Sequence, residues 1–220
     1  MLLAVDTSTD DASVALYSKH GLLAERTWRS GRRHSEQILP AIDDLLRDIG
    51  AGPEQIEILA VALGPGSWSG LRVGLSLVKG VAVTRGLPVV GVGSLEILAY
   101  PHQRVGRPVV PVIKMGRDRY AVVEYRLRRR WGPTSEPRNV SLDELVAAIP
   151  EVALVCGDLS ESLVTAIRRV RDEGVIFATP ALNLRRAGYL AEIAWLRHSL
   201  GDYDDLISLE PIYLGSPVRS

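Results

Sequence analysis

Cysteine is nearly absent from this sequence: the 220 residues include one, Cys156, within the apolar run VALVCGD. A lone cysteine cannot build an intramolecular disulfide framework, so the sequence fits a reducing compartment. The apolar run is typical of a buried strand. We therefore expect Cys156 to be a small buried residue at a strand end.

An excess of charge of one sign is also missing. The chain has 26 Lys and Arg against 26 Asp and Glu, which gives a formal net charge of zero. Such a chain is not expected to grip nucleic acid alone through a broad basic face. Arginines do cluster locally, at Arg128–Arg130 beside Trp131 and at Arg32–Arg33, and for these clusters we expect a solvated surface.

Long hydrophobic runs are absent too. No apolar segment approaches the length that spans a membrane, and the opening MLLAVDTS is strand-like, without the basic start of a secretion signal. We expect a soluble, cytoplasmic protein.

Metal-ligand spacings are missing as well. The four histidines are His20, His34, His102 and His198, and no two of them stand four residues apart. C-x-x-C is absent, so we expect no zinc site. No serine lies on a recognised nucleophile turn, which gives no positive sign of a Ser-His-Asp triad.

The sequence does contain a repeated order of elements, with enough apolar residues (46%) for a sizeable core. Hydrophobic periodicity predicts strands at 2–7, 12–18 and 22–29, a helix at 34–49, a strand at 56–63 and a helix at 71–84. The second half repeats this order of elements. We predict strands at 109–114 and 120–127, a helix that starts at a capping box formed by Ser141 and Glu144, and a last helix at 184–198. We predict an α/β fold of two lobes, 1–103 and 104–220, each roughly β-β-β-α-β-α with a mixed sheet.

The stretch LGPGSWSGLRVG, residues 63–74, joins a predicted strand to a predicted helix. It lacks the third glycine of a dinucleotide fingerprint, the lysine of a Walker A loop and the central serine of a nucleophile elbow. Two interpretations remain open. The helix start could bind an anion, or the glycines could serve positive φ angles and close packing.

The helix after this loop is apolar over most of its circumference. At 100° per residue, Gly70, Gly74, Leu77 and Val81 share one face, and the neighbouring face is apolar too. Such a helix is covered on more than one side, and small residues one turn apart allow close approach. The second cover is either a neighbouring helix of this chain or a partner protein.

The first predicted hairpin has a polar tip. Asp6, Thr7 and Ser8 follow the first strand and bring together a carboxylate and two hydroxyls. Such a tip can hold Mg²⁺ and phosphate, or it can form a turn stabilised by its own side chains. The sequence leaves both interpretations open.

Three stretches carry a resemblance to a known family. VDTST, RHSEQILPAIDDLL and GPGSWSGLRVGLSLVKGVA, in this order and spacing, closely resemble the TsaB (YeaZ) family over about the first hundred residues, and the closing EPIYL is also similar. The resemblance implies a duplicated actin-like ATPase fold, of the ASKHA and ribonuclease H-like type.

The resemblance also implies a function. TsaB-like proteins are catalytically silent partners of TsaD, the metal-bearing subunit that transfers a threonylcarbamoyl group to the adenosine next to the tRNA anticodon. The ATPase TsaE joins the pair, and tRNA is reached indirectly. This chain would need no cofactor of its own, because ATP and metal belong to TsaD and TsaE. Where TsaD has a histidine pair, this chain offers His34 alone.

In the family, the two helices of the first lobe form the pairing surface, and a homodimer uses the same surface when the protein is alone. The implied interface residues are His34, Ser35, Ile38, Leu39, Ile42, Leu46, Gly70, Arg72, Gly74, Leu77, Val78 and Val81. Gly74→Arg is then expected to abolish pairing and to leave the monomer folded. Asp6, Thr7 and Ser8 would be a vestigial phosphate loop. The sequence departs from many relatives at Lys114 and Met115, where an acidic run is common.

Two alternatives compete with the scaffold. A small-molecule or acyl kinase with a truncated second lobe would use Asp6 for Mg²⁺ and the glycine loop for phosphate. A protease would need a metal or a nucleophile, and the sequence points to neither.

Overall fold

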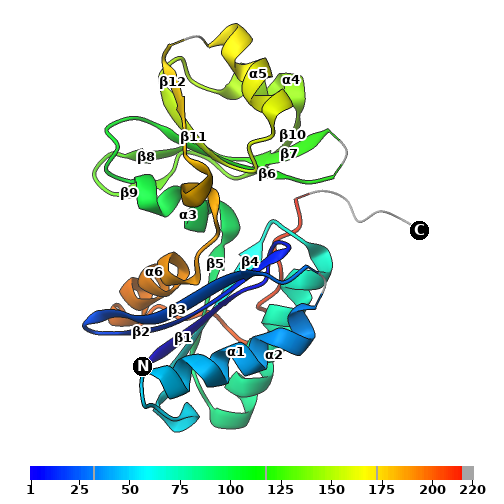
Figure 1. Cartoon of the computed structure of the whole chain (residues 1–220). Helices are drawn as coiled ribbons and strands as arrows, with labels where there is room; N and C mark the ends of the chain where they lie inside the picture. The colour runs from blue at the N-terminus through cyan, green and yellow to red at the C-terminus, as the bar shows by residue number, and fades with distance from the viewer. Residues whose placement is uncertain (32, 117, 172, 215–220) are drawn as a thin grey trace. The chain divides into compact units, whose positions relative to one another are not determined.

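The structure is a computed structural model that describes residues 1–31, 33–116, 118–171 and 173–214 (Figure 1). Its contacts divide the chain into two units. The first comprises Met1–Ile97 and Arg185–Ile212, and the second comprises Leu98–Leu184 and the chain from Tyr213. The predicted lobes, 1–103 and 104–220, differ from these units mainly at the C-terminal end, because residues 185–212 pack on the first unit.

The first unit contains a five-stranded mixed sheet in the order β3-β2-β1-β4-β5. Its strands are β1 (Leu2–Asp6), β2 (Asp11–Ser18), β3 (Gly21–Arg29), β4 (Ile58–Gly64) and β5 (Val89–Gly93). β2 runs antiparallel to β1 and β3, whereas β4 runs parallel to β1 and β5. Helix α1 (His34–Asp48) and a short 3-10 turn (Pro53–Gln55) connect β3 to β4, and α2 (Trp68–Arg85) connects β4 to β5.

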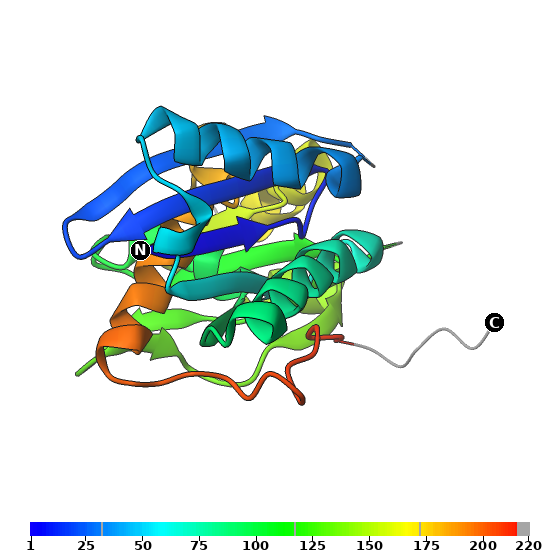
Figure 2. The same ribbon diagram turned by 90° about the horizontal axis from the view of Figure 1, so that it is seen from below.

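Helices cover both faces of this sheet. Figures 1 and 2 show α1 and α2 on one face and α6 (Ala187–Ser199) on the other. Leu3 and Val5 of β1 pack with Ile38 of α1 and Val78 of α2 in one buried cluster. Strands covered on both faces read as continuous apolar runs, which explains ILAVAL in β4.

Helix α6 is fixed to the first sheet at its N-terminus. The Ala187 amide donates to Ser13 Oγ (2.8 Å), the Gly188 amide donates to Glu25 Oε1 (2.8 Å), and Arg186 forms an ion pair with Glu25. These acceptors satisfy amide groups that a helix start leaves without intrahelical partners. The placement corrects the prediction that the helix at 184–198 belongs to the second lobe.

The segment after α6 runs along the β5 side of the same sheet. The Asp204 amide donates to Val89 O (3.0 Å), Asp204 Oδ2 accepts from the Gly91 amide (2.7 Å), and the Ile212 amide donates to Leu63 O (2.7 Å). Leu209 enters the core cluster. The segment therefore covers an edge that would otherwise leave backbone groups unpaired.

The second unit repeats the arrangement. Its strands follow the order β10-β7-β6-β11-β12, with β6 (Val109–Lys114), β7 (Arg119–Val122), β10 (Arg138–Ser141), β11 (Ala153–Gly157) and β12 (Val175–Phe177). Helix α4 (Leu142–Ala148) precedes β11, and α5 (Glu161–Val170) precedes β12. The predicted capping box is confirmed, since Ser141 Oγ accepts from the Glu144 amide (3.3 Å) and Glu144 Oε2 accepts from the Ser141 amide (2.7 Å). Both units thus confirm the predicted duplication.

A hairpin absent from the first unit interrupts this repeat. β8 (Tyr125–Leu127) and β9 (Trp131–Pro133) pair with each other between β7 and β10 in the sequence. The predicted strand at 120–127 is therefore two strands. β7 pairs with β6 and β10, whereas β8 turns to pair with β9 and touches β6 at one position, Val109 with Tyr125.

Short helices complete the described chain. These are α3 (Ser94–Ala99), a 3-10 turn at Tyr100–His102 before β6, and another at Pro180–Asn183 before α6. Among the described residues, no helix combines the length and the apolar character needed to cross a bilayer.

Candidate functional site

A groove of about 390 Å³ lies between α1 and α2 in the first unit. Its lining residues are Ser35, Ile38 and Leu39 from α1 and Arg72, Val73, Ser76 and Leu77 from α2. Apolar side chains from both helices meet there, with serines and one arginine among them. The groove is therefore a concave, largely apolar surface of the kind that binds a partner side chain or helix.

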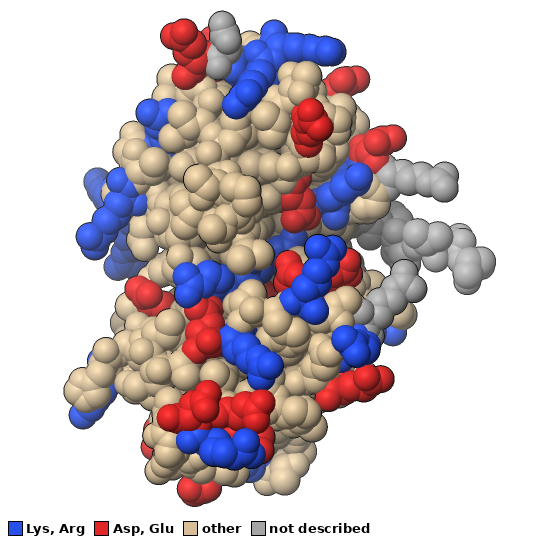
Figure 3. All heavy atoms as spheres, in the orientation of Figure 1, with Lys and Arg blue, Asp and Glu red and all other residues tan. Residues whose placement is uncertain are grey.

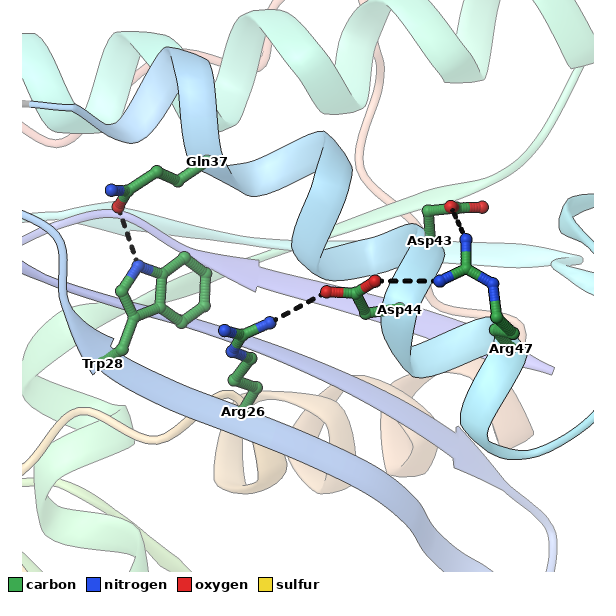
Figure 4. Close-up of polar contacts among 6 residues, drawn as sticks. All are labelled: Arg26, Trp28, Gln37, Asp43, Asp44 and Arg47. Atoms are coloured by element: carbon green, nitrogen blue, oxygen red, sulfur yellow. Dashed lines mark hydrogen bonds and ion pairs between the residues drawn. The ribbon is translucent and has the colours of Figure 1, made fainter.

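Helix α1 is held so that Leu39 faces solvent. Its inner side is buried, including Ile38, while the Leu39 side chain remains 57% exposed. Contacts with β3 fix the helix (Figure 4): Trp28 Nε1 donates to Gln37 Oε1 (2.9 Å), and Arg26 pairs with Asp44 (3.1 Å). The exposed ion pair adds little stability. The half-buried hydrogen bond from the Trp28 indole to Gln37 instead fixes how α1 is turned about its own axis, and therefore which way Leu39 faces.

Helix α2 presents an aromatic side chain beside the groove. Ser67 caps the helix by accepting from the Gly70 amide (3.3 Å), and the next residue, Trp68, is 57% exposed. The Arg72 guanidinium carbon lies 3.5 Å from the Trp68 ring centroid, a cation–π arrangement one helical turn apart. Sequence reasoning missed Trp68 as a surface residue, because the stretch at 63–74 was compared only with glycine-loop and nucleophile motifs.

The residues predicted to meet a partner fall into two groups. Ser35, Leu39 and Arg72 are exposed, and Leu77 and Val81 are half-buried. The others are buried within the chain itself: His34, Ile38, Ile42, Leu46, Gly70, Gly74 and Val78. Of the residues predicted to meet a partner, only the exposed and half-buried ones are therefore accessible. Most of the buried ones pack beneath them in the core of the first unit.

Gly70 and Gly74 face inward. A Cβ atom on Gly70 would overlap the carbonyl oxygen of Thr7, and one on Gly74 would lie 2.5 Å from Thr7 Oγ1. The close approach that these glycines permit is therefore to the chain's own β1 end. This corrects the expectation that their face meets a partner helix and that Gly74→Arg would leave the monomer folded.

The hairpin tip and the glycine loop close on each other. Thr7 Oγ1 donates to Gly70 O (2.7 Å), and Ser8 O accepts from the Ser67 amide (2.7 Å). A Cβ atom on Gly66 would overlap Ser8 O. Of the two interpretations of the glycine loop, the geometry supports close packing, because the space beside its glycines is filled by the hairpin.

A buried charge cluster lies beneath this contact. Asp6 is 2% exposed, and its Oδ1 accepts from the Ser8 amide (2.8 Å). Burial raises the pKa of Asp6, against the lowering effects of its Ser8 hydrogen bonds and of the charges on Arg185 and His34. Arg185 is also buried and donates through Nη1 to Ser8 O (3.1 Å) and Ser8 Oγ (3.2 Å). Sequence reasoning missed Arg185, since no local pattern links it to a hairpin 177 positions earlier.

The groups present do not fit a metal ion. His34 is buried, and its Nδ1 has no hydrogen-bond partner within the described part of the chain. No set of three or more His, Cys, Asp or Glu side chains that could hold a metal occurs among the described residues. One imidazole cannot supply the three or four ligands of a protein zinc site.

Cys156 lies where the sequence predicted it. It is fully buried near the end of β11, and burial raises the pKa of its thiol to about 12. A thiol with so high a pKa is a poor nucleophile at neutral pH. Cys156 thus belongs to the core of the second unit.

Comparison with known proteins connects these features to a family. Residues 23–148, more than half of the chain, match the family model described as TsaD, tRNA N6-adenosine threonylcarbamoyltransferase. The tRNA threonylcarbamoyladenosine biosynthesis protein TsaB of Haemophilus influenzae is 28% identical, over 99% of this chain and 94% of its own. The TsaB protein of Bacillus subtilis is 37% identical over 98 residues, which are 44% of this chain and 43% of that one.

Two solved structures bear on the fold. YeaZ from Pseudomonas aeruginosa aligns with a TM-score of 0.82 at 24% identity, over 97% of this chain and 99% of its own. The activator of the 2-hydroxyisocaproyl-CoA dehydratase from Clostridium difficile, with bound ADPNP, aligns with a TM-score of 0.53 at 12% identity, over 93% and 98% of the two chains. Together with the repeated strand order, these likenesses confirm the predicted duplicated actin-like fold.

Proposed function

The chain belongs to the TsaD family and resembles the TsaB (YeaZ) proteins, and on that premise we propose that it is a non-catalytic subunit that pairs with a TsaD homologue. The pair acts in threonylcarbamoyladenosine formation on tRNA, next to the anticodon. TsaD performs the transfer, and this chain acts as scaffold and activator.

The observation that carries the proposal is the groove between α1 and α2. A soluble subunit does not gain stability by holding Leu39 and Trp68 in water, each 57% exposed, beside a largely apolar hollow. A partner that inserts apolar side chains between the two helices would cover both. A standard protein–protein interface buries about 1,600 Å² in total.

The hairpin and the glycine loop support the non-catalytic part of the proposal. The polar groups of Thr7 and Ser8 are already hydrogen-bonded within the chain, to α2, to the glycine loop and to Arg185. A phosphate at this place would have to displace those bonds. The kinase alternative needs the same groups free, and no observation favours it.

The remaining partners follow from the same premise. TsaE binds the assembled pair, ATP and metal reside on TsaD and TsaE, and two copies of this chain pair through the groove when TsaD is absent. The protein then works in the cytoplasm, where tRNA is modified.

Leu39→Glu tests the groove directly. The change places a charge on an exposed side chain, so we expect the monomer to fold normally and co-purification with the co-expressed TsaD homologue to fall at least tenfold. Leu200→Glu is the matched control, since Leu200 is 82% exposed and follows α6 on the opposite face of the sheet. Equal co-purification of the two variants with TsaD would show that the groove is not the pairing surface.

Two further assays separate the scaffold from the kinase. tRNA threonylcarbamoylation by the TsaD homologue and TsaE should require this chain and should fall with Leu39→Glu. Calorimetry of the isolated chain with MgATP should give no heat of binding. Micromolar binding that disappears in Asp6→Asn would overturn the scaffold in favour of the kinase.

A further inference from the structure

Positive charge is concentrated in one stretch of this neutral chain. Between residues 98 and 138 the sequence has ten Lys and Arg against three Asp and Glu, although the whole chain has 26 of each. This stretch lies in the second unit and includes the β8–β9 hairpin that the first unit lacks. The local excess is invisible in the net charge and has no part in the groove between α1 and α2.

The hairpin displays three consecutive arginines at its tip. Arg128, Arg129 and Arg130 form the turn between β8 and β9, where the Arg128 amide donates to Arg130 O (3.2 Å), and all three are exposed. Below the turn, the rings of Tyr125 and Trp131 stack with centroids 5.6 Å apart. The stacked rings pack the two strands of the hairpin against each other just below the turn that carries the arginines.

The segment before β6 places further arginines beside the hairpin. A hollow of about 420 Å³ is lined by Arg104 and Arg107 from the segment before β6 and by Arg126 and Leu127 from β8, among others. We call Arg104, Arg107, Arg126 and Arg128–Arg130 the arginine patch. Figure 3 shows Lys and Arg side chains gathered on the side where Figure 1 places β8 and β9.

Few carboxylates neutralise the patch. Arg126 pairs with Glu124, and Arg107 donates weakly to Gly174 O (3.4 Å). Within the described residues, no ion pair involves Arg104 or any of the three arginines at the tip. Exposed guanidinium groups at this density repel one another, and they are held together at a cost that a polyanion would relieve.

We propose that the arginine patch binds the phosphate backbone of RNA, so that this subunit contacts tRNA directly. Arginine suits this ligand because its planar group offers paired N–H donors to phosphate oxygens and can stack on an exposed base. The hollow and the projecting hairpin tip together make an uneven surface. Such a surface fits the grooves and ridges of a folded RNA backbone better than a flat surface would. The choice of tRNA as the RNA rests on the proposed function, whereas binding to phosphate rests on the patch alone.

The test is direct binding of the purified full-length chain to a fluorescent, unmodified tRNA transcript, followed by anisotropy across salt concentrations. We compare Arg128→Gln/Arg130→Gln with Arg168→Gln/Arg169→Gln, a matched pair of exposed arginines on α5 in the same unit. Each phosphate contact contributes about 0.7–0.9 to the slope of log affinity against log salt. The patch variant should therefore lose about 1.5 from the slope and bind at least tenfold more weakly at low salt, while the α5 variant binds like wild type.

The possible outcomes are distinguishable. Equal losses in both variants, or wild-type affinity in the patch variant, would overturn the proposal. If poly-glutamate competes as well as unlabelled tRNA, the patch serves an acidic protein surface and the RNA proposal is wrong. Leu39→Glu should bind tRNA normally, and the patch variant should still co-purify with TsaD. Failure of pairing therefore leaves RNA binding measurable, and failure of RNA binding leaves pairing intact.

Discussion

The two units share one strand order, yet they treat the same turn in opposite ways. In the first unit, the turn after β1 is buried, and its residues bond to the start of α2 and to Arg185. In the second unit, the corresponding turn after β6 is open to solvent at most of its described residues, although the Lys114 amide donates to Asp158 Oδ2 in the loop before α5 (2.9 Å). Lys114 is exposed, and a Cβ atom on Gly116 would meet nothing within 4 Å.

The contrast extends to the loops that face these turns. Ser67 caps α2 and Ser160 caps α5 in the same manner, so the local helix starts are alike. In the first loop, Gly66 and Gly70 let the turn after β1 pack against the start of the helix, whereas in the second loop Gly157 lies against Val112 O, within β6 and before the turn. The two units therefore share the topology, but the turn after the first strand of each sheet is buried in the first unit and largely exposed in the second.

Gly70→Ala should be the most damaging change. The added methyl group overlaps the Thr7 carbonyl, and we expect a loss of about 3 kcal/mol in the free energy of unfolding, the upper range for overpacking. Gly80→Ala, in the same helix with open space around it, should instead stabilise by about 0.5–1 kcal/mol. Urea unfolding measures both, and similar values for the two variants would contradict the closed turn.

Arg185→Met should rank second. The change removes the Nη1 hydrogen bonds to Ser8 and a positive charge near buried Asp6, at an expected cost of about 2 kcal/mol. Lys114→Met at the open turn should stay within about 0.5 kcal/mol of wild type, because that side chain is exposed. Melting temperatures of the two methionine variants give the comparison. A fully stable Arg185→Met would mean that Arg185 does not help to close the turn.

Asp6→Asn should have an effect that depends on pH. Burial raises the pKa of Asp6 above its ordinary value of 3.8, so the folded state holds the proton more tightly than the unfolded chain. The contribution of this carboxyl to stability is therefore fully present below 3.8 and is lost as the pH rises through the folded-state pKa. Asparagine does not titrate, so the stability of the variant relative to wild type should increase with pH over that window, by at most about 1.4 kcal/mol per pH unit.

The measurement is urea unfolding of both proteins at several pH values between 4.5 and 8, in steps of about half a unit, fine enough to resolve that slope. A relative stability that falls with rising pH would mean that favourable charges, not burial, dominate at Asp6.

Asp118→Gly should have the smallest effect. Asp118 has a φ of 50°, a left-handed conformation that glycine adopts more easily, but glycine also loses more backbone entropy on folding. The two effects nearly cancel, so we expect a change below about 0.5 kcal/mol. A larger loss in urea unfolding would show that the open turn is more constrained than its exposure indicates.

Much of the fold followed from sequence because its signals are local. Apolar periodicity located α1 and α2, and Ser141 with Glu144 marked the start of α4. The break between β7 and β8 was missed, since the apolar pattern continues through Val123 while the pairing partners change. The docking of α6 was missed because it depends on Ser13 and Glu25, more than 160 residues away.

The candidate site was predicted only in part, for a related reason. Periodicity showed that α2 is apolar on more than one side, but it does not reveal which neighbour covers each side. Gly70 and Gly74 were therefore assigned to a partner, although they face Thr7. Leu39 was assigned to the interface by the family resemblance alone, since its apolar character fits the buried pattern of the helix equally well, and the structure leaves it 57% exposed, outside the stripe that α1 buries.

The return of α6 to the first sheet also has a consequence for synthesis on the ribosome. β5 ends at Gly93, but the helix that covers the second face of that sheet begins at Ala187, after residues 98–184 of the second unit have been translated. At about 5–20 residues per second, that face stays bare for roughly 5–20 s. All strands and helices of the second unit are thus made before the first unit is covered, and during that interval the bare strands could bind chaperones.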